Sequence, residues 1–187
     1  MYSIDDKQLS SDLRHLRDQT VTGDGVEPSG INFLKSMLPE LTDPDDRYRI
    51  YQYLLSELRI HSDFVGALEW AQKRLVEFGD IVSRDSVARA LLELGRNLEA
   101  LTEFRIAFRA AVESNKLVNF TFGEFMRAMV KVGDIETVNS VTREYFALKL
   151  PKSEADCALE TDWLDVAEAQ GAQRELIGEL RRRKSSN

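Results

Sequence analysis

The residues of this chain that could carry acid–base, nucleophilic or metal chemistry are few and widely spaced. His15 and His61 are its only histidines, and Cys157 is its only cysteine. A zinc site needs several histidine or cysteine ligands at short, regular spacing, so the sequence predicts no metal centre. A cysteine near the start of an expected helix is more often a small buried hydrophobe than a nucleophile. His61 is expected at a helix end, where a partial positive charge is favourable.

Two stretches rich in glycine or aspartate also fail to match ligand-binding loops. Residues 23–25 read Gly-Asp-Gly, but no strand precedes them and no Gly-Lys-Ser/Thr follows, as a dinucleotide or phosphate loop requires. Asp43, Asp45 and Asp46 lack the glycine and the downstream glutamate of a calcium loop. They fit a helix start better, with Asp43 as the cap and Pro44 at the first position. The sequence therefore predicts no catalytic residue and no cofactor.

Composition narrows the class of protein. The chain has 187 residues, a hydrophobic content of 43% and a formal net charge of −7. Long stretches rich in glutamate, leucine, alanine and arginine favour helix, and no alternating apolar pattern indicates a strand, so the expected class is all-α. The last sixteen residues carry +3, which leaves −10 for the rest. An acidic body disfavours nucleic-acid binding, because phosphate contacts supply most of that affinity.

The sequence also favours a soluble protein in a reducing, cytoplasmic compartment. Its N-terminal residues do not show the basic and then apolar pattern of a secretory signal. No apolar stretch approaches the ~20 residues that span a bilayer, so no membrane partner is expected. A single cysteine cannot form an internal disulfide.

The elements that would organise these residues are helical hairpins that recur along the chain. The clearest covers residues 87–108, where a leucine-rich amphipathic pattern stops at Gly95 and a second helical pattern starts at once. Similar stops occur at Ser62, Gly133 and Gly171. Repeats of about 34 residues built from two helices indicate a solenoid, in which each unit buries its apolar face against its neighbours. An ordinary helical bundle with glycine stops is the alternative.

These hairpins resemble the tetratricopeptide repeat family in a degenerate form. With Gly95 as the turn, the first helix of the second copy matches the family's apolar positions at Val87, Ala88 and Leu91. The second helix matches its small, aromatic and small positions at Ala100, Phe104 and Ala107. The other copies match at fewer positions, which are Leu54, Leu58 and Ala67 in the first copy, Phe125, Met126, Met129, Val138 and Tyr145 in the third, and Trp163, Leu164 and Ala167 in the fourth. The family's terminal proline is missing, because Val112 stands there. The resemblance implies antiparallel hairpins in a short right-handed α-solenoid.

The expected domain plan follows from these stops. Residues 1–43 form an N-terminal helical arm or cap, with a helix over residues 6–17 and a flexible loop at 20–30. Residues 44–184 form the repeat domain, followed by a tail at 185–187. The four hairpins are expected at about 44–79, 82–114, 119–149 and 154–184, with residues 83–85 opening a helix of the second hairpin and Asp134 capping a helix of the third. Terminal repeats need a cover, since an unpaired hairpin exposes its apolar face.

In tetratricopeptide-like arrays the first helices line a concave groove. The resemblance places on this groove a cationic strip and one aromatic side chain, which are the candidate partner-binding residues: Arg59, Arg89, Arg127, Lys131 and Phe120. Arginine suits carboxylate recognition, because its planar fork binds bidentately. The alternative is that these cations pair with Asp85, Glu93 and Glu124 on neighbouring turns. The run at residues 181–184 is better explained by cations that complement the dipole at the C-terminus of a last helix than by a basic patch for a partner.

Three functions are compatible with such a chain. The leading hypothesis is a non-enzymatic interaction module, an adaptor, scaffold or regulatory subunit that binds a peptide or protein partner in the groove. An acidic partner would suit the cationic strip. The second is a helical-repeat RNA-binding protein, suggested by a likeness of residues 120–147 to a pentatricopeptide repeat, which the acidic body disfavours. The third is an enzyme with a helical pocket, which no sequence motif supports.

Overall fold

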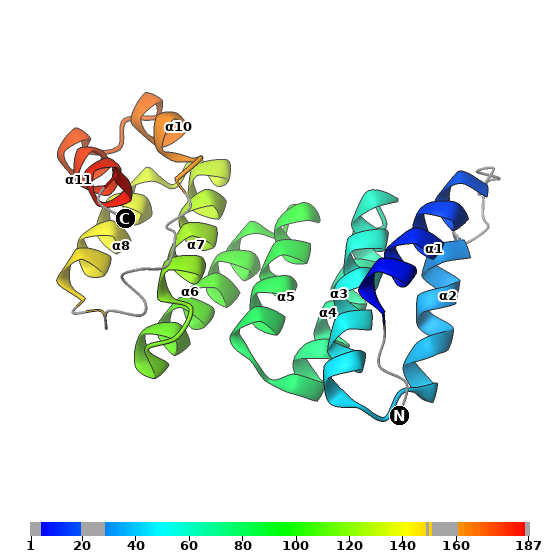
Figure 1. The fold of residues 1–187 in the computed structure, drawn as a ribbon. Helices are drawn as coiled ribbons and strands as arrows, with labels where there is room; N and C mark the ends of the chain where they lie inside the picture. The colour runs from blue at the N-terminus through cyan, green and yellow to red at the C-terminus, as the bar shows by residue number, and fades with distance from the viewer. Residues whose placement is uncertain (1–4, 20–28, 149, 151–160, 186–187) are drawn as a thin grey trace. The chain divides into compact units, whose positions relative to one another are not determined.

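The computed structural model describes residues 5–19, 29–148, 150 and 161–185. Every regular element in these ranges is a helix, so the all-α class predicted from the sequence is confirmed (Figure 1). The elements, in chain order, are α1 (Asp6–Gln19), α2 (Ser29–Met37), a 3-10 turn η1 (Leu38–Glu40), α3 (Pro44–Ile60), α4 (Phe64–Phe78), α5 (Ile81–Glu93), α6 (Asn97–Ser114), α7 (Val118–Val132), α8 (Ile135–Ala147), α10 (Leu164–Ala169) and α11 (Arg174–Ser185).

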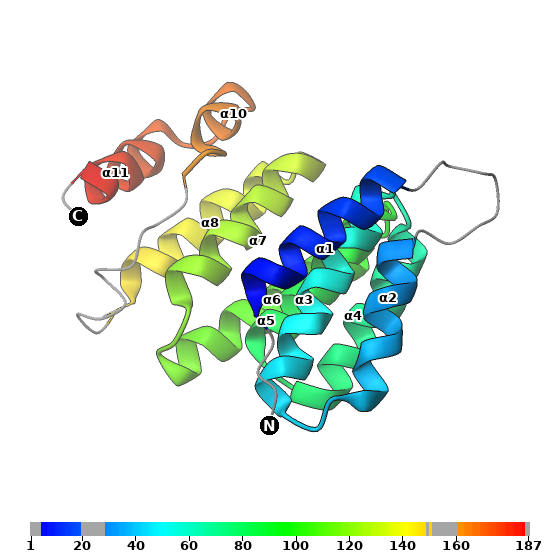
Figure 2. The ribbon, with the colours of Figure 1, turned by 45° about the vertical axis from the view of Figure 1, so that its right-hand side comes forward.

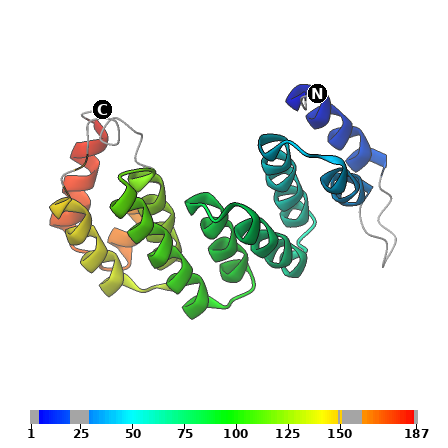
Figure 3. The ribbon, with the colours of Figure 1, turned by 90° about the horizontal axis from the view of Figure 1, so that it is seen from below.

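The helices form two compact units, residues 1–78 and residues 79–187. In the first unit α1 packs against α2, α2 against α3 and α3 against α4. In the second unit α5, α6, α7 and α8 pack in succession, and α11 contacts α8 and α10. Figures 2 and 3 show these neighbours side by side within each unit. Within each unit, most of the helices that pack against each other are therefore consecutive in the sequence.

The four predicted hairpin turns share one backbone conformation. Ser62, Gly95, Gly133 and Gly171 all have positive φ, at 58°, 72°, 77° and 97°. The amide that follows each of them donates a hydrogen bond to a carbonyl five residues back, and the bonds are Asp63 to Leu58, Arg96 to Leu91, Asp134 to Met129 and Ala172 to Ala167, at 2.8–3.0 Å. This is the Schellman arrangement, which satisfies carbonyls at a helix end. The left-handed turn predicted at Gly95 is confirmed.

The first turn uses the same conformation without a glycine. A residue with a Cβ atom pays roughly 1 kcal/mol to adopt the left-handed region, and Ser62 is exposed. We expect Ser62→Gly to raise the free energy of unfolding by about 0.5–1 kcal/mol, measured by urea denaturation. Gly95→Ser is the reciprocal control and should lower it by a similar amount, since a Cβ at Gly95 would meet no atom within 4 Å. A destabilising Ser62→Gly would contradict the shared turn geometry.

The core predicted for the second hairpin is confirmed. Ala88, Leu91, Ala100, Phe104 and Ala107 are all buried, on α5 and α6, which pack against each other. The three alanines leave space for the two helices to approach closely, and the Phe104 ring fills the space between them.

Two helix starts follow the capping chemistry expected from the sequence. The Asp43 side chain accepts hydrogen bonds from backbone amides in the first turn of α3, and Pro44 is the first residue of that helix. The Asp134 carboxylate accepts a hydrogen bond from the Thr137 amide at 3.0 Å and caps α8. Each cap satisfies amides that have no partner inside the helix.

A third predicted start is wrong. The helix expected to open at residues 83–85 begins two residues earlier, at Ile81, because the Asp80 side chain accepts the Ser83 amide at 2.6 Å and is the true cap. Asp85, expected as a partner of the groove cations, is buried on α5.

The chain ends match the expected plan where they are described. The helix expected over residues 6–17 is α1 and runs on to Gln19. The expected loop at 20–30 lies mostly outside the described residues, and its last two residues, Ser29 and Gly30, already belong to α2. Residues 151–160, which include the expected start of the fourth hairpin, also lie outside the described part.

Candidate functional site

A chain of alternating charges links the first helices of the second and third hairpins. On α5, Arg89 Nε donates to Asp85 Oδ2 at 2.7 Å, one helical turn away. The Arg89 Nη2 atom lies 2.7 Å from Glu124 Oε2 on α7. The other oxygen of Glu124 accepts from Arg127 on α7. One carboxylate therefore bridges two arginines on different helices.

Asp162 closes the chain at its other end. The Arg127 guanidinium donates from Nη2 to Asp162 Oδ1 at 2.8 Å and from Nε to Oδ2 at 3.1 Å. These hydrogen bonds hold the pKa of Asp162 below its ordinary value. Asp162 lies just before α10 and is thirty-five residues from Arg127 in the sequence. The five side chains from Asp85 to Asp162 are called the ion-pair chain below.

The members of the ion-pair chain differ greatly in exposure. The side chains of Asp85 and Glu124 retain only 4% and 6% of their accessible surface, whereas that of Asp162 retains 64%. Arg89 and Arg127 are about one third exposed. Two of the pairings expected as the alternative to partner binding, those with Asp85 and Glu124, are thus present. Asp162 was not expected.

The ion-pair chain borders a cavity of about 160 Å³ between α5, α6 and α7. Its lining combines an apolar part with charged groups, and consists of Leu92, Phe104, Ala128, Arg89, Arg127, Lys131, Glu93 and Glu124. Three of the five candidate residues, Arg89, Arg127 and Lys131, therefore lie together. Lys131 is exposed and makes no ion pair with any residue in the described ranges.

The other two candidate residues lie elsewhere. Arg59 is on α3, in the first compact unit, and is half-buried. Phe120 is in the first turn of α7, is half-buried and does not line the cavity.

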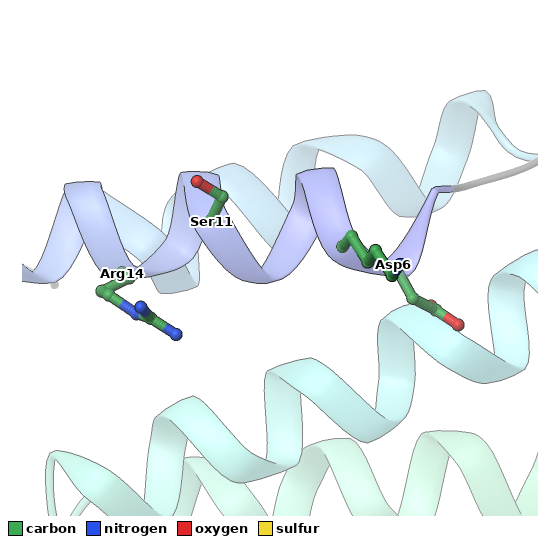
Figure 4. Close-up of a pocket in the computed structure, with 4 residues that line it drawn as sticks. Asp6, Ser11 and Arg14 are labelled. Carbon is green, nitrogen blue, oxygen red and sulfur yellow. The ribbon is translucent and has the colours of Figure 1, made fainter.

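A second hollow surface occurs in the first unit, on α1 and α3. Asp6, Lys7, Ser11 and Arg14 line a space of about 400 Å³ along α1 (Figure 4). An adjoining space of about 340 Å³ is lined by Asp6 again and by four residues of α3, Arg49, Gln52, Tyr53 and Ser56. Apart from the Tyr53 ring, this lining is polar. Ligand sites are usually mostly apolar with a few placed polar groups, so the smaller cavity at the ion-pair chain is the better candidate.

The arginines near the C-terminus are engaged within the chain. Arg181 pairs with Asp165 at 2.5 Å and with Glu168 at 2.9 Å, which ties α11 to α10. Arg182 pairs with Glu179 at 2.7 Å, and the Arg183 guanidinium lies 4.5 Å from the centre of the Phe146 ring. Arg181, Arg182 and Arg183 are therefore engaged in contacts within the chain.

Residues with metal or nucleophilic chemistry do not gather at either surface. His61 caps the end of α3, as expected, and its Nε2 lies 4.0 Å from Glu57 Oε2. Within the described ranges, no three His, Cys, Asp or Glu side chains are close enough to hold a metal ion. Cys157 lies outside these ranges. None of the described helices has the length and apolarity needed to cross a bilayer.

The chain was compared with models of protein families, with curated proteins and with solved structures, and none of the three comparisons finds a match.

Proposed function

We propose that this chain is a non-enzymatic, tetratricopeptide-like interaction module that binds a peptide segment of a protein partner at the cavity between α5 and α7. The observation that carries the proposal is the convergence of Arg89, Arg127 and Lys131, from the first helices of two successive hairpins, on one partly apolar cavity. The repetition of one turn geometry at four positions supports a repeat architecture. A right-handed solenoid and a cytoplasmic location belong to the same proposal.

The combination of apolar and charged side chains in the cavity lining suits a peptide ligand. Leu92 is partly exposed and offers apolar contact for one side chain of the partner, while the buried Phe104 and Ala128 form the apolar floor of the cavity. Charged groups beside an apolar surface fix the orientation and register of a bound segment. Phosphate recognition by RNA is the less favourable use, because Arg89 and Arg127 already face two carboxylates each.

The first test is an unbiased selection of peptides displayed on phage, with the whole chain immobilised. We expect Lys131→Glu to weaken binding of the selected peptides about tenfold or more, because a charge-assisted hydrogen bond contributes roughly 1.5–3 kcal/mol. Binding is measured by fluorescence anisotropy. Arg143→Glu makes the same charge change at an exposed position on α8 and should leave affinity unchanged.

Charge reversal at the two arginines is a poor test. It would place new carboxylates against the buried side chains of Asp85 and Glu124, and repulsion there would destabilise the fold itself. Lys131 avoids this problem. A selection that enriches no peptide, or peptides that bind Lys131→Glu as tightly as the unmodified chain, would overturn the proposal.

A further inference from the structure

The only strongly exposed acid of the ion-pair chain, Asp162, is paired with one of the two arginines that line the cavity. Asp162 is 64% exposed, and both its oxygens accept from the Arg127 guanidinium. Arg127 also lines the cavity between α5 and α7. Arg127 therefore holds the Asp162 carboxylate at the edge of the candidate site with two hydrogen bonds.

The other two carboxylates of the ion-pair chain cannot be exchanged in this way. Asp85 and Glu124 are almost fully buried, and releasing either would leave charge stranded in the protein interior. An exposed ion pair, in contrast, is held only weakly, because water solvates both partners well. A carboxylate from solution can therefore compete for Arg127 only at the place of Asp162.

The neighbour of Asp162 makes this exchange observable. Trp163 is buried, and its ring lies 6.1 Å from the Phe122 ring of α7 in an edge-on contact. Departure of the Asp162 carboxylate from Arg127 changes the charge distribution beside this tryptophan, which is the next residue in the chain. The chain has two tryptophans, so replacing Trp70 leaves Trp163 as the single reporter.

We propose that Asp162 stands in for a carboxylate of the partner, and that an aspartate or glutamate side chain of the bound peptide takes its place on Arg127. This inference rests on the proposed function and names the chemistry of its ligand. Arg127 is the anchor for the incoming carboxylate, and Asp162 lowers the apparent affinity by occupying that anchor in the free protein.

The size of the effect follows from the weakness of the internal pair. An internal competitor reduces affinity by the fraction of molecules in which the anchor is open. For an exposed pair of ordinary strength this fraction is about one fifth to one third. Asp162→Ala should therefore tighten binding of an acidic peptide about three- to fivefold.

The experiment uses two defined fluorescein-labelled peptides, Gly-Leu-Glu-Ser repeated three times and its neutral counterpart with glutamine for glutamate. Affinities are measured for the full chain and for Asp162→Ala, Arg127→Gln and Asp165→Ala. Asp165 is the matched control, because it is 90% exposed, lies three residues further on and pairs with Arg181 instead of Arg127. Unlabelled acidic peptide is then titrated into the Trp70→Phe protein while Trp163 emission is followed.

The expected result is a three- to fivefold gain for the acidic peptide in Asp162→Ala, little change in Asp165→Ala, loss of the preference for glutamate in Arg127→Gln, and a shift of Trp163 emission on binding. An equal gain in both aspartate variants would mean that only overall charge matters and would overturn the inference. So would an absence of saturable binding by the acidic peptide, or an unchanged affinity in Asp162→Ala. The phage selection judges the proposed function separately, so these failures are distinguishable from a failure of peptide binding as such.

Discussion

Phe122→Ala is expected to lower the free energy of unfolding of the second unit by about 4 kcal/mol, since truncating a fully buried phenylalanine typically costs 3–5 kcal/mol. Phe122 is completely buried on α7. Its ring stacks on Tyr145 with centroids 4.0 Å apart and contacts Phe108 and Trp163 at 6.1 Å. The substitution therefore removes the ring that joins α6, α8 and the segment before α10.

The measurement is urea denaturation followed by circular dichroism and by Trp163 fluorescence in a Trp70→Phe background. Phe120→Ala is the matched control, because Phe120 lies two residues earlier on the same helix and is only half-buried. It should cost well under half as much. Equal losses for the two variants would show that the aromatic cluster does not organise this unit.

Glu124→Ala has the second largest expected effect, a loss of about 2–3 kcal/mol. Removing one member of a buried ion pair typically costs 3–5 kcal/mol, because the remaining charges lose their partner. The value is reduced here, since Arg89 and Arg127 are about one third exposed and can turn partly toward water. Glu124→Gln should cost less than Glu124→Ala, because its amide oxygen still accepts from one arginine.

Thermal and urea unfolding of both variants provide the check. Glu144→Ala removes an acid from an exposed position on α8 and serves as the control, with an expected change within about 0.5 kcal/mol. If Glu124→Ala were as stable as Glu144→Ala, the bridge between the two arginines would be a surface contact that contributes nothing to the free energy of unfolding.

Local signals explain why much of the fold could be predicted from the sequence. The turn at Gly95 and the caps at Asp43 and Asp134 depend on a few neighbouring residues, so the local sequence is enough to predict them. The burial of Ala100 and Phe104 follows from helical spacing alone.

The candidate site was predicted only in part, because its geometry depends on distant contacts. Arg89, Arg127 and Lys131 share a helix face in the repeat register, and they meet at one cavity. The pairing of Arg127 with Asp162 joins positions thirty-five residues apart, and the periodicity of the sequence does not predict it. The burial of Asp85 was not predicted for a related reason, since spacing indicates a helix face but not how deeply its neighbours cover that face.

Packing between consecutive helices has a consequence for how the protein is made. Helix α3 packs against α4, and α5 packs against α6. The two helices of each of these hairpins can therefore pack together as soon as the residues of that hairpin have left the ribosome. Contacts that are close in sequence cost little loop entropy, which favours rapid folding. The nascent chain can thus acquire its hairpins in the order of synthesis, and the contact of Asp162 with Arg127 is among the last to form.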